Sequence, residues 1–452
     1  MTKRKQHLLE CAVAMAVAAS PAGVHASGFQ LMEQNASGLG NAYAGQAAAA
    51  EDASTIYFNP AGLTRLPGGQ AVQAIHIISP SAKFRDAASV GAAGGVARGG
   101  SAGDAGDLAL IPSLYLSWQF TPNVFAGIGI STPFGLKTNY EPDWVGRFHA
   151  LKSEARSINV NPAVAIKISD TLSVGVGVSY QHFEAELTKA VNYTALGAGI
   201  GIPVAAGTEG TNKIEGDDRS WGANIGVLFK AGPNTDIGVA YRSPVMHTLK
   251  GDVIFYNRPA ALGGAAAFNS AGDGPIKARL KLPASASLAI KHRINPGWMG
   301  RGGWEFLADL TWTQWSGIHS LDIIRSNEFQ LESTPFQWRD TWRMGVGVNY
   351  HASQPWTYRF GVAYDQTPTS TQYRTPRIPD QDRKWVALGA QYRISKTGAI
   401  DVGYAHLFFK DANMNLSGPP ALTAAQAAGR GSLVGNYDGE VDIVSVQYRH
   451  LF

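Results

Sequence analysis

The feature that most constrains this chain is a succession of about fourteen stretches with β-strand character beyond residue 69, several of which alternate cleanly with a period of two. In one such stretch Trp356, Tyr358 and Phe360 alternate with Thr357 and Arg359. Successive side chains of a β-strand point to opposite faces, so the pattern predicts strands with one apolar face and one small or polar face. Beyond residue 70 the chain is therefore predicted to be all-β.

The apolar faces are bracketed by aromatic residues, as in a membrane β-barrel. Trp342 and Tyr350 enclose Met344, Val346 and Val348 on one face of their stretch. Eight residues at about 3.3 Å each, tilted by about 40°, span about 20 Å, which is close to the apolar band of an outer-membrane barrel. The apolar faces are therefore expected to meet lipid.

The connections between the predicted strands alternate between short and long. Thr121-Pro122 and Ser169-Asp170 are examples of the short ones, and 190–216 and 251–275 of the long ones. Bacterial outer-membrane barrels have short periplasmic turns and long extracellular loops. The alternation thus predicts an antiparallel outer-membrane barrel of about fourteen strands, with both chain ends in the periplasm.

The last strand supports the same prediction. One of its faces carries Val444, Val446, Tyr448, His450 and Phe452, and the chain stops on the aromatic residue. This ending resembles the terminal signature that is recognised when outer-membrane barrels are assembled, with His450 as a mild departure from it.

The first 26 residues predict a secretory signal peptide. Lys3, Arg4 and Lys5 precede an apolar core, and Val24-His25-Ala26 provides a small-x-small cleavage site. The single cysteine, Cys11, lies within this leader, so the exported chain is expected to have no disulfide. Charged residues make up only 16% of the chain, and no run beyond the leader is apolar and long enough for a membrane helix. The expected location is the bacterial outer membrane.

Residues 27–69 differ from everything that follows. They are rich in small residues, lack any long alternation and offer only short helices. A compact non-β segment in front of a barrel can lie in the barrel lumen. The predicted organisation is a signal peptide at 1–26, a small helical hatch at 27–69 and a transmembrane barrel at 70–452.

Several motifs resemble the FadL/OmpP1/TodX family of outer-membrane transporters of long-chain fatty acids and other hydrophobic compounds. They are Gly28-Phe29-Gln30-Leu31, Ser37-Gly38-Leu39-Gly40-Asn41-Ala42-Tyr43-Ala44-Gly45, Asn59-Pro60-Ala61-Gly62-Leu63, Pro133-Phe134-Gly135-Leu136 and Trp144-Val145-Gly146-Arg147. The resemblance covers the whole mature chain. It implies that hydrophobic substrate enters a groove between extracellular loops, moves to a deeper site against the hatch, and leaves sideways through a kink in the third strand.

The resemblance also points to gating residues. In the third strand Gly127 and Gly129 are the residue type that permits broken pairing, and they are the candidates for the wall kink. In the hatch, Asn59-Pro60-Ala61 is expected to form a stiff corner in which Asn59 bonds backbone that the kink has opened; an ordinary turn is the alternative. The full set of hatch candidates is Ser27, Gly28, Phe29, Asn59, Pro60 and Ala61.

Candidate substrate contacts come from two loops and three arginines. The apolar loop candidates are Leu196, Ile200, Ile202 and Val204 in one loop, and Phe255, Tyr256, Leu262 and Phe268 in the other. Packing of loop against loop is the alternative role for them. An acyl carboxylate in a lumen of low dielectric needs a cation, and the predicted inward-facing candidates are Arg339, Arg343 and Arg359, unless they pair with lumen acids instead.

No enzyme motif is present. The sequence has no P-loop, no G-x-S-x-G and no H-E-x-x-H, and its histidines lack metal-ligand spacing. We therefore expect no enzyme, no cofactor, no metal and no nucleic-acid partner, and a monomer in contact with outer-membrane lipid and lipopolysaccharide. Three functions stay open: transport of long-chain fatty acids, the same mechanism for monoaromatic hydrocarbons or other hydrophobic molecules, and a structural or receptor barrel without conduction.

Overall fold

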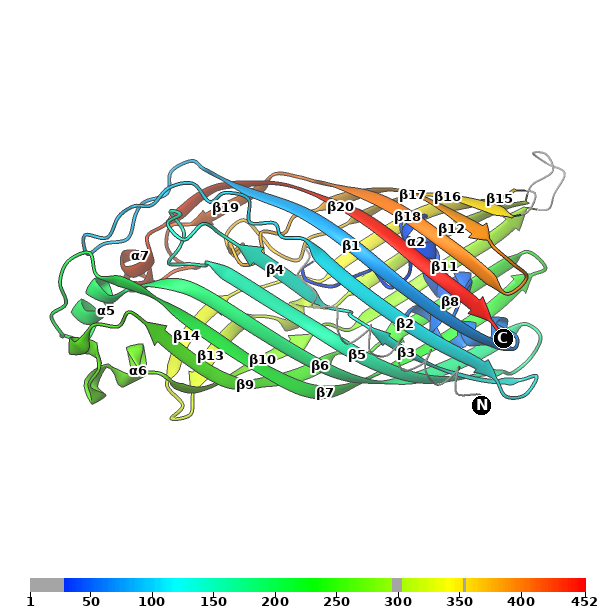
Figure 1. Ribbon diagram of the computed structural model, residues 1–452, viewed down its shortest axis with the longest axis horizontal. Helices are drawn as coiled ribbons and strands as arrows, with labels where there is room; N and C mark the ends of the chain where they lie inside the picture. The colour runs from blue at the N-terminus through cyan, green and yellow to red at the C-terminus, as the bar shows by residue number, and fades with distance from the viewer. Residues whose placement is uncertain (1–27, 295–302, 353–354) are drawn as a thin grey trace.

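A computed structural model of the protein describes residues 28–294, 303–352 and 355–452. The leader 1–26 and Ser27 lie outside the described residues. Within these residues, twenty strand segments form a single sheet that closes on itself, with long, tilted strands along the barrel (Figure 1). The first ten segments are β1 Gly69–Asp86, β2 Ala109–Gln119, β3 Val124–Ser131, β4 Gly135–Asn139, β5 Lys152–Lys167, β6 Leu172–Asn192, β7 Glu209–Gly232, β8 Thr235–Arg242, β9 Val245–Tyr256 and β10 Gly274–Leu282.

Six of the wall strands are interrupted once, so the twenty segments make fourteen strands. The second ten segments are β11 Ser285–Ile294, β12 Gly303–Thr313, β13 Ser320–Arg325, β14 Gln330–Pro335, β15 Thr341–His351, β16 Trp356–Asp365, β17 Arg383–Arg393, β18 Gly398–Phe409, β19 Ala412–Leu416 and β20 Leu433–Leu451. The interrupted strands are β3/β4, β8/β9, β10/β11, β12/β13, β14/β15 and β18/β19, in each of which both segments pair with the same neighbouring strand. β20 pairs antiparallel with β1 and closes the barrel. The predicted antiparallel barrel and its strand number are confirmed.

The two faces of each strand lie as the alternation predicts. In β16 the side chains of Trp356, Tyr358 and Phe360 are exposed on the outer surface, whereas Thr357 and Arg359 are buried on the inner side. Apolar side chains that remain exposed over a whole belt are stable only against lipid, which explains why the outer face is apolar and the inner face polar. Among the described residues no helix is long and apolar enough to cross a membrane.

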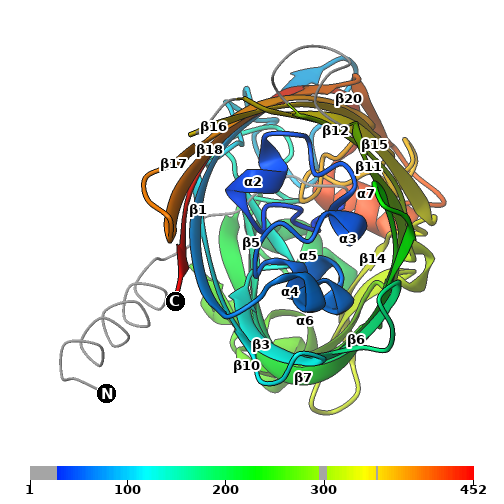
Figure 2. The ribbon, with the colours of Figure 1, turned by 90° about the vertical axis from the view of Figure 1, so that its right-hand side faces the viewer.

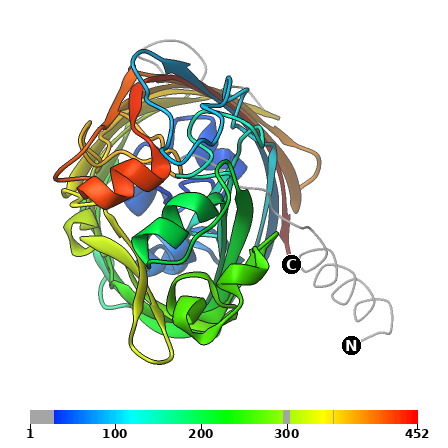
Figure 3. The ribbon, with the colours of Figure 1, turned by 90° about the vertical axis from the view of Figure 1, so that its left-hand side faces the viewer.

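The two ends of the barrel differ. The C-terminus and short turns lie at one end, and long loops cover the other (Figure 1). Seen from the long-loop end, the green helix α5 (Tyr193–Gly199) and the orange-red helix α7 (Ala424–Arg430) lie side by side across the mouth (Figure 3). The remaining short helices of the wall loops are η2 Ala260–Leu262, η3 Ala265–Ala267, α6 Phe268–Ala271 and η4 Trp315–Gly317.

Residues 28–68, which we call the hatch, lie inside the barrel (Figure 2). Its helices are short: α2 Ala36–Leu39, α3 Gln46–Ala49, α4 Thr55–Phe58 and η1 Pro60–Arg65. Glycines on the inner face let the hatch backbone approach the wall. A Cβ built on Gly361 would lie 2.1 Å from the Asn41 carbonyl oxygen, and one on Gly238 would lie 1.9 Å from that of Ala47. The glycine-rich face of the alternation is thus the surface on which the hatch packs.

Candidate functional site

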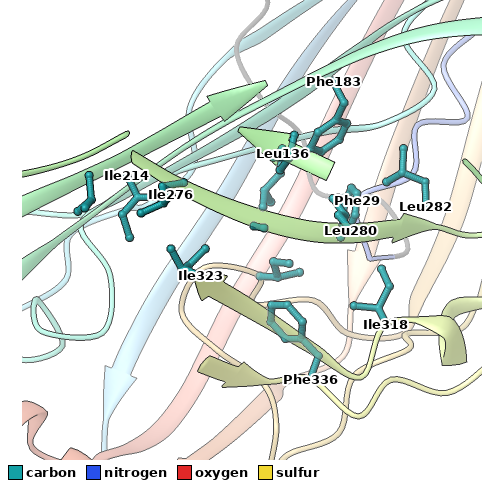
Figure 4. Packing of buried hydrophobic residues seen from close by; sticks show 14 of the residues in the cluster. Phe29, Leu136, Phe183, Ile214, Ile276, Leu280, Leu282, Ile318, Ile323 and Phe336 are labelled. Carbon is teal, nitrogen blue, oxygen red and sulfur yellow. The ribbon is translucent and has the colours of Figure 1, made fainter. Parts of the chain in front are cut away.

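An apolar cavity lies beside the hatch, inside the barrel. Figure 4 shows side chains from the hatch and from several wall strands pointing into the same region. The lining residues are apolar or glycine except for Glu215 and Arg377. They are Phe29, Leu136, Ala155, Phe183, Ala185, Leu187, Ile214, Glu215, Gly216, Leu249, Ile276, Ala278, Leu280, Leu321, Ile323, Phe336, Arg377 and Ile378.

Phe29 is the contribution of the hatch to this cavity. Its ring lies 5.2 Å from that of Trp315, 5.7 Å from that of Phe134 and 5.9 Å from that of Trp338. The preceding Gly28 has a φ of +60°, and a Cβ there would lie 2.8 Å from the Trp315 ring. Only glycine combines a positive φ with the absence of a Cβ, so only glycine fits at position 28 without strain. This backbone conformation places the Phe29 ring in the aromatic cluster.

The segment that carries Phe29 also pairs with an interruption in the wall. The Leu31 N–H donates to the Pro133 carbonyl at 2.8 Å, and the Gly135 N–H donates to the Phe29 carbonyl at 2.9 Å. Pro133 lies between β3 and β4. Backbone groups left without a strand partner there are thus satisfied by the hatch.

The interruption leaves one seam of the barrel wall without a ladder. β2 pairs with β3 only from Leu114 to Gln119, and within the described chain the β2 residues 109–113 have no strand partner on that side. β4 pairs with β5 alone. Both edges contain an imino residue that cannot donate to a ladder, Pro112 in β2 and Pro133 beyond β3.

This geometry corrects the expectation for Gly127 and Gly129. Both lie in the regular part of β3, which pairs with β2 on one side and with β5 on the other. Their place is explained by the hatch and the wall: a Cβ on Gly127 would lie 2.7 Å from the Ile56 side chain, and one on Gly129 would lie 2.7 Å from the Tyr115 ring. The break comes after Ser131.

The start of the hatch is held from the opposite direction by a loop carboxylate. The Gly28 N–H donates to Asp380 Oδ2 at 3.0 Å, and the Thr367 hydroxyl donates to the same oxygen at 2.6 Å. Burial raises the pKa of the Asp380 carboxyl to about 6. Phe29 therefore lies between two fixed points, the Asp380 carboxylate and the wall interruption.

Asn59 fixes the other part of the hatch. Its Nδ2 donates to the Ala47 carbonyl at 2.6 Å and to the Val227 carbonyl of β7 at 3.0 Å, and its Oδ1 accepts from the Ala61 N–H at 3.0 Å. A Cβ on Gly226 would lie 1.9 Å from that Oδ1. The expectation that Asn59 bonds backbone opened at the third-strand kink is wrong, because the opened backbone is bonded by the chain near Phe29.

Replacing Asn59 with alanine should loosen the hatch without opening the barrel. The Ala47 carbonyl would be left buried and unpaired, at a cost of about 1–3 kcal/mol. We expect faster hydrogen exchange of hatch amides around α3 and η1, and unchanged exchange in β16 and β17. The control is Asn59→Asp, which keeps the acceptor for Ala61 and loses both donors. Equal exchange in all three proteins would show that Asn59 does not hold the hatch.

The three predicted arginines do not reach the cavity. Arg343 donates to the Ala42 carbonyl and pairs with Asp309 at 3.5 Å, and Arg359 pairs with Glu51 of the hatch at 2.8 Å. Both lie on the inner face, as predicted, but they bind the hatch to the wall. Arg339 is exposed, so its predicted inward orientation is wrong, and its Nε donates to the Thr367 carbonyl.

Arg377, which the sequence did not single out, is the cation that lines the cavity. It is buried, and its Nη1 donates to Ser153 Oγ at 3.0 Å and to the carbonyls of Lys152 and Thr188 at longer range. A second cavity below the long loops is also lined by Arg377, together with Glu332 and others. Arg377 therefore stands where the two cavities adjoin.

Positive charge exceeds negative charge around Arg377. The Glu332 carboxylate pairs with Lys189 at 2.6 Å and with Arg430 at 3.3 Å. This single negative charge is therefore shared by two other cations and cannot also neutralise Arg377. Burial lowers the pKa of the Arg377 guanidinium, while the Glu332 charge opposes that shift. A buried cation with so little counter-charge favours an incoming anion. Arg377 follows Pro376 in the long loop between β16 and β17. It reaches the cavity because this loop folds into the barrel, which the sequence around Arg377 does not indicate.

The apolar loop candidates are only partly brought together. Phe255 and Leu262 are buried in the same hydrophobic cluster as Phe29, and Leu196, Ile200, Ile202 and Val204 pack against it. Tyr256 and Phe268 are exposed, and the Phe268 ring lies 5.2 Å from the Arg325 guanidinium. The cavity itself is lined by strand residues that the loop-based prediction missed, although their alternation places them on the inner face.

A closed barrel with a lipid-facing belt, a hatch in its lumen and an apolar cavity beside the hatch defines a class of protein, the plugged outer-membrane channels for hydrophobic molecules. Residues 15–452 match the family described as outer membrane protein transport protein (OMPP1/FadL/TodX). The chain belongs to this family of outer-membrane transporters of hydrophobic compounds, as the sequence motifs predicted.

Named relatives agree with this assignment. The long-chain fatty acid transport protein of Escherichia coli (strain K12) is 26% identical over 91% of this chain and 94% of its own length. The crystal structure of a Pseudomonas aeruginosa FadL homologue is 26% identical, with a TM-score of 0.84 over 94% of this chain and 100% of the homologue. The Ralstonia pickettii toluene transporter TbuX is 19% identical, with a TM-score of 0.60 over 88% and 94%, and it shares the fold.

Proposed function

We propose that this protein carries long-chain fatty acids across the outer membrane by passive diffusion. The observation that carries the proposal is the apolar cavity with the Arg377 guanidinium at its edge. Alkyl chains gain about 0.8 kcal/mol for each CH₂ that leaves water, so the cavity favours them. The carboxylate at the end of such a chain needs a cation in these surroundings, and Arg377 supplies it.

Entry runs from the long-loop end. The second cavity, below helix α7, is lined by Arg377, Glu332 and Arg430, and adjoins the apolar cavity at Arg377. A carboxylate that enters this region meets cations before its alkyl chain reaches the apolar walls. The charged residues therefore orient the molecule, with its carboxylate toward the loops and its alkyl chain toward Phe29.

The hatch start acts as the gate. Phe29 lines the cavity, while the backbone on either side of it bonds Asp380 and the β3–β4 interruption. A substrate tail that displaces Phe29 also withdraws the hydrogen bonds that fill the interruption. The seam between β2 and β4 then connects the cavity with the bilayer, and the substrate leaves sideways, driven by its concentration gradient.

The second candidate substrate is a monoaromatic hydrocarbon. Apart from Arg377 and Glu215 the cavity lining is apolar, and an uncharged ring requires no cation. A barrel that conducts nothing is the third possibility.

Uptake of labelled oleate and of toluene by cells that lack their own transporter, with and without this protein, tests the proposal. We expect oleate uptake that depends on the protein and saturates with concentration. Toluene uptake without oleate uptake would move the function to hydrocarbons. Absence of both, with the barrel folded in the membrane, would overturn the proposal in favour of a structural or receptor barrel.

A further inference from the structure

The barrel wall has another seam without a ladder, between β7 and the interrupted strand β8/β9. β7 pairs with β9 over its residues 211–217 and with β8 over 224–232. Between these stretches, β7 residues 218–223 have no strand partner on this side anywhere in the described chain; they face residues 243–249. We call this the β7–β9 seam. It is separate from the β2–β4 seam, from which β5 and β6 divide it.

The β7–β9 seam has no continuous ladder and is held largely by side chains, although a backbone bond from the Ser243 N–H to the Ala223 carbonyl at 2.8 Å crosses its end next to β8. The Ser220 hydroxyl donates to the Met246 carbonyl at 2.6 Å, and Ser243 Oγ accepts from the Ala223 N–H at 2.9 Å. Pro244, at the break between β8 and β9, has no N–H to offer a ladder. Each such hydroxyl bond is worth about 0.5–1.5 kcal/mol, so this part of the wall opens at lower cost than a continuous ladder.

Cavities lie behind the seam on the lumen side. The apolar cavity is lined by Gly216 of β7 and Leu249 of β9, at one end of the seam. Another cavity, between hatch and wall, is lined by Asn224 of β7 and Arg242 of β8, at the other end of the seam. A molecule in either cavity is therefore separated from the outside by this unladdered part of the wall.

The outer side of the seam faces lipid near the long-loop end of the membrane belt. Trp221 is 66% exposed and Met246 57% exposed, so both present apolar surface outward. The Trp221 ring lies 4.9 Å from that of Tyr180, an aromatic pair of the kind that marks the border of the apolar band. The seam thus joins an apolar interior to the outer leaflet.

A comparable interruption is blocked from inside. Residues 279–284, from the second half of β10 to the start of β11, lack a partner on β13 within the described chain, but the fully buried Trp315 and the buried Phe336 and Trp338 lie behind that region. At the β7–β9 seam the inner side chains are smaller. His247 is bonded there to Asp218 at 2.9 Å, beside Val245 and Gly222.

We infer that the β7–β9 seam is a further lateral passage, through which hydrophobic molecules exchange between the lumen cavities and the outer leaflet of the membrane. The inference rests on the proposed function, because it concerns the route of the same carried molecules. Opening requires that the Ser220 and Ser243 hydroxyls exchange partners and that Val245 moves away from Gly222. The bonds from the Ser243 N–H to the Ala223 carbonyl and between His247 and Asp218 must also break.

A disulfide across the seam tests this. A Cβ built on Gly222 lies 2.8 Å from the Val245 side chain, so Gly222→Cys with Val245→Cys places two thiols close together in a mature chain expected to have no other cysteine. The matched control is Val227→Cys with Val239→Cys, which joins the same wall strands where the ladder is intact. Gly222→Leu fills the seam without any disulfide. Oleate and toluene uptake is measured with and without reductant.

Closing one of two parallel routes of similar width should lower the initial uptake rate about twofold. We expect this loss in the oxidised seam pair, with recovery on reduction, and in Gly222→Leu, but not in the control pair. Unchanged uptake in both seam variants, while the unmodified protein transports, overturns the passage and leaves the proposed function standing. If the unmodified protein carries neither solute, the proposed function fails first, and the passage with it.

Discussion

Deleting Pro133 should abolish exit through the β2–β4 seam for every carried solute and so lower the initial uptake rate about twofold, which leaves only the route through the β7–β9 seam. Ser131 of β3 faces Asn159 of β5, whereas Gly135 of β4 faces Arg156, so four steps along the interrupted strand match three along β5. Removing one residue restores the register and keeps each side chain on its present face. It also removes the residue that cannot donate.

A continuous third strand would then be free to pair with β2 residues 109–113. Each ladder hydrogen bond contributes about 0.5–1.5 kcal/mol, so several new bonds would hold the β2–β4 seam closed. The control is Pro133→Ala, which restores the N–H but keeps the extra residue, and which should retain most uptake. Folding of each variant is checked by resistance of the barrel to unfolding in detergent on a gel. Normal uptake by a folded deletion variant would show that solutes leave elsewhere.

Replacing Arg377 with leucine should weaken fatty acid uptake selectively. A hydrogen bond between charged groups contributes about 1.5–3 kcal/mol, which is about 10- to 150-fold in affinity. Because Arg377 is the cation that lines the apolar cavity in the described structure, little else there can replace it. Arg377→Lys should show a smaller loss, since lysine keeps the charge but not the forked geometry.

The measurement is the concentration dependence of oleate uptake, with toluene as the internal control. Arg377 also bonds Ser153 and the nearby carbonyls, so a general loss of structure would lower uptake of both solutes together. Weaker oleate uptake with unchanged toluene uptake supports the carboxylate role. An equal loss of both solutes, or no loss of either, would contradict it.

The local sequence pattern is sufficient to predict the barrel, because the backbone geometry of a strand sets the period of the alternation. Each stretch such as 356–365 needs only its own residues to show which face meets lipid, and the number of stretches gave the number of strands. The six interruptions do not show in this alternation. Pairing partners decide where a strand breaks, and Ser243-Pro244 or Thr132-Pro133 marks a break only when the neighbouring strand is known.

The same distinction explains the site. Phe29 and Asn59 stood out because the motifs around them resemble a known family, and the structure places Phe29 beside the cavity. For the three arginines the sequence indicates only which face of a strand each one occupies. Arg343 and Arg359 do lie on the inner face, but they bond to the hatch and do not line the cavity. No local sequence pattern shows which part of the lumen the hatch fills.

By itself the sequence determined the barrel, its strand number, its lipid-facing belt and the existence of a separate segment in front of it. These follow from short-range regularities that every strand repeats. Only the tertiary structure decided which wall seams lack a ladder, where the apolar cavity lies and that Arg377 is its cation. Those features arise where the hatch, an inward-folded loop and several distant strands meet. Contacts between residues so far apart in the chain produce no periodic sequence pattern from which they could be predicted.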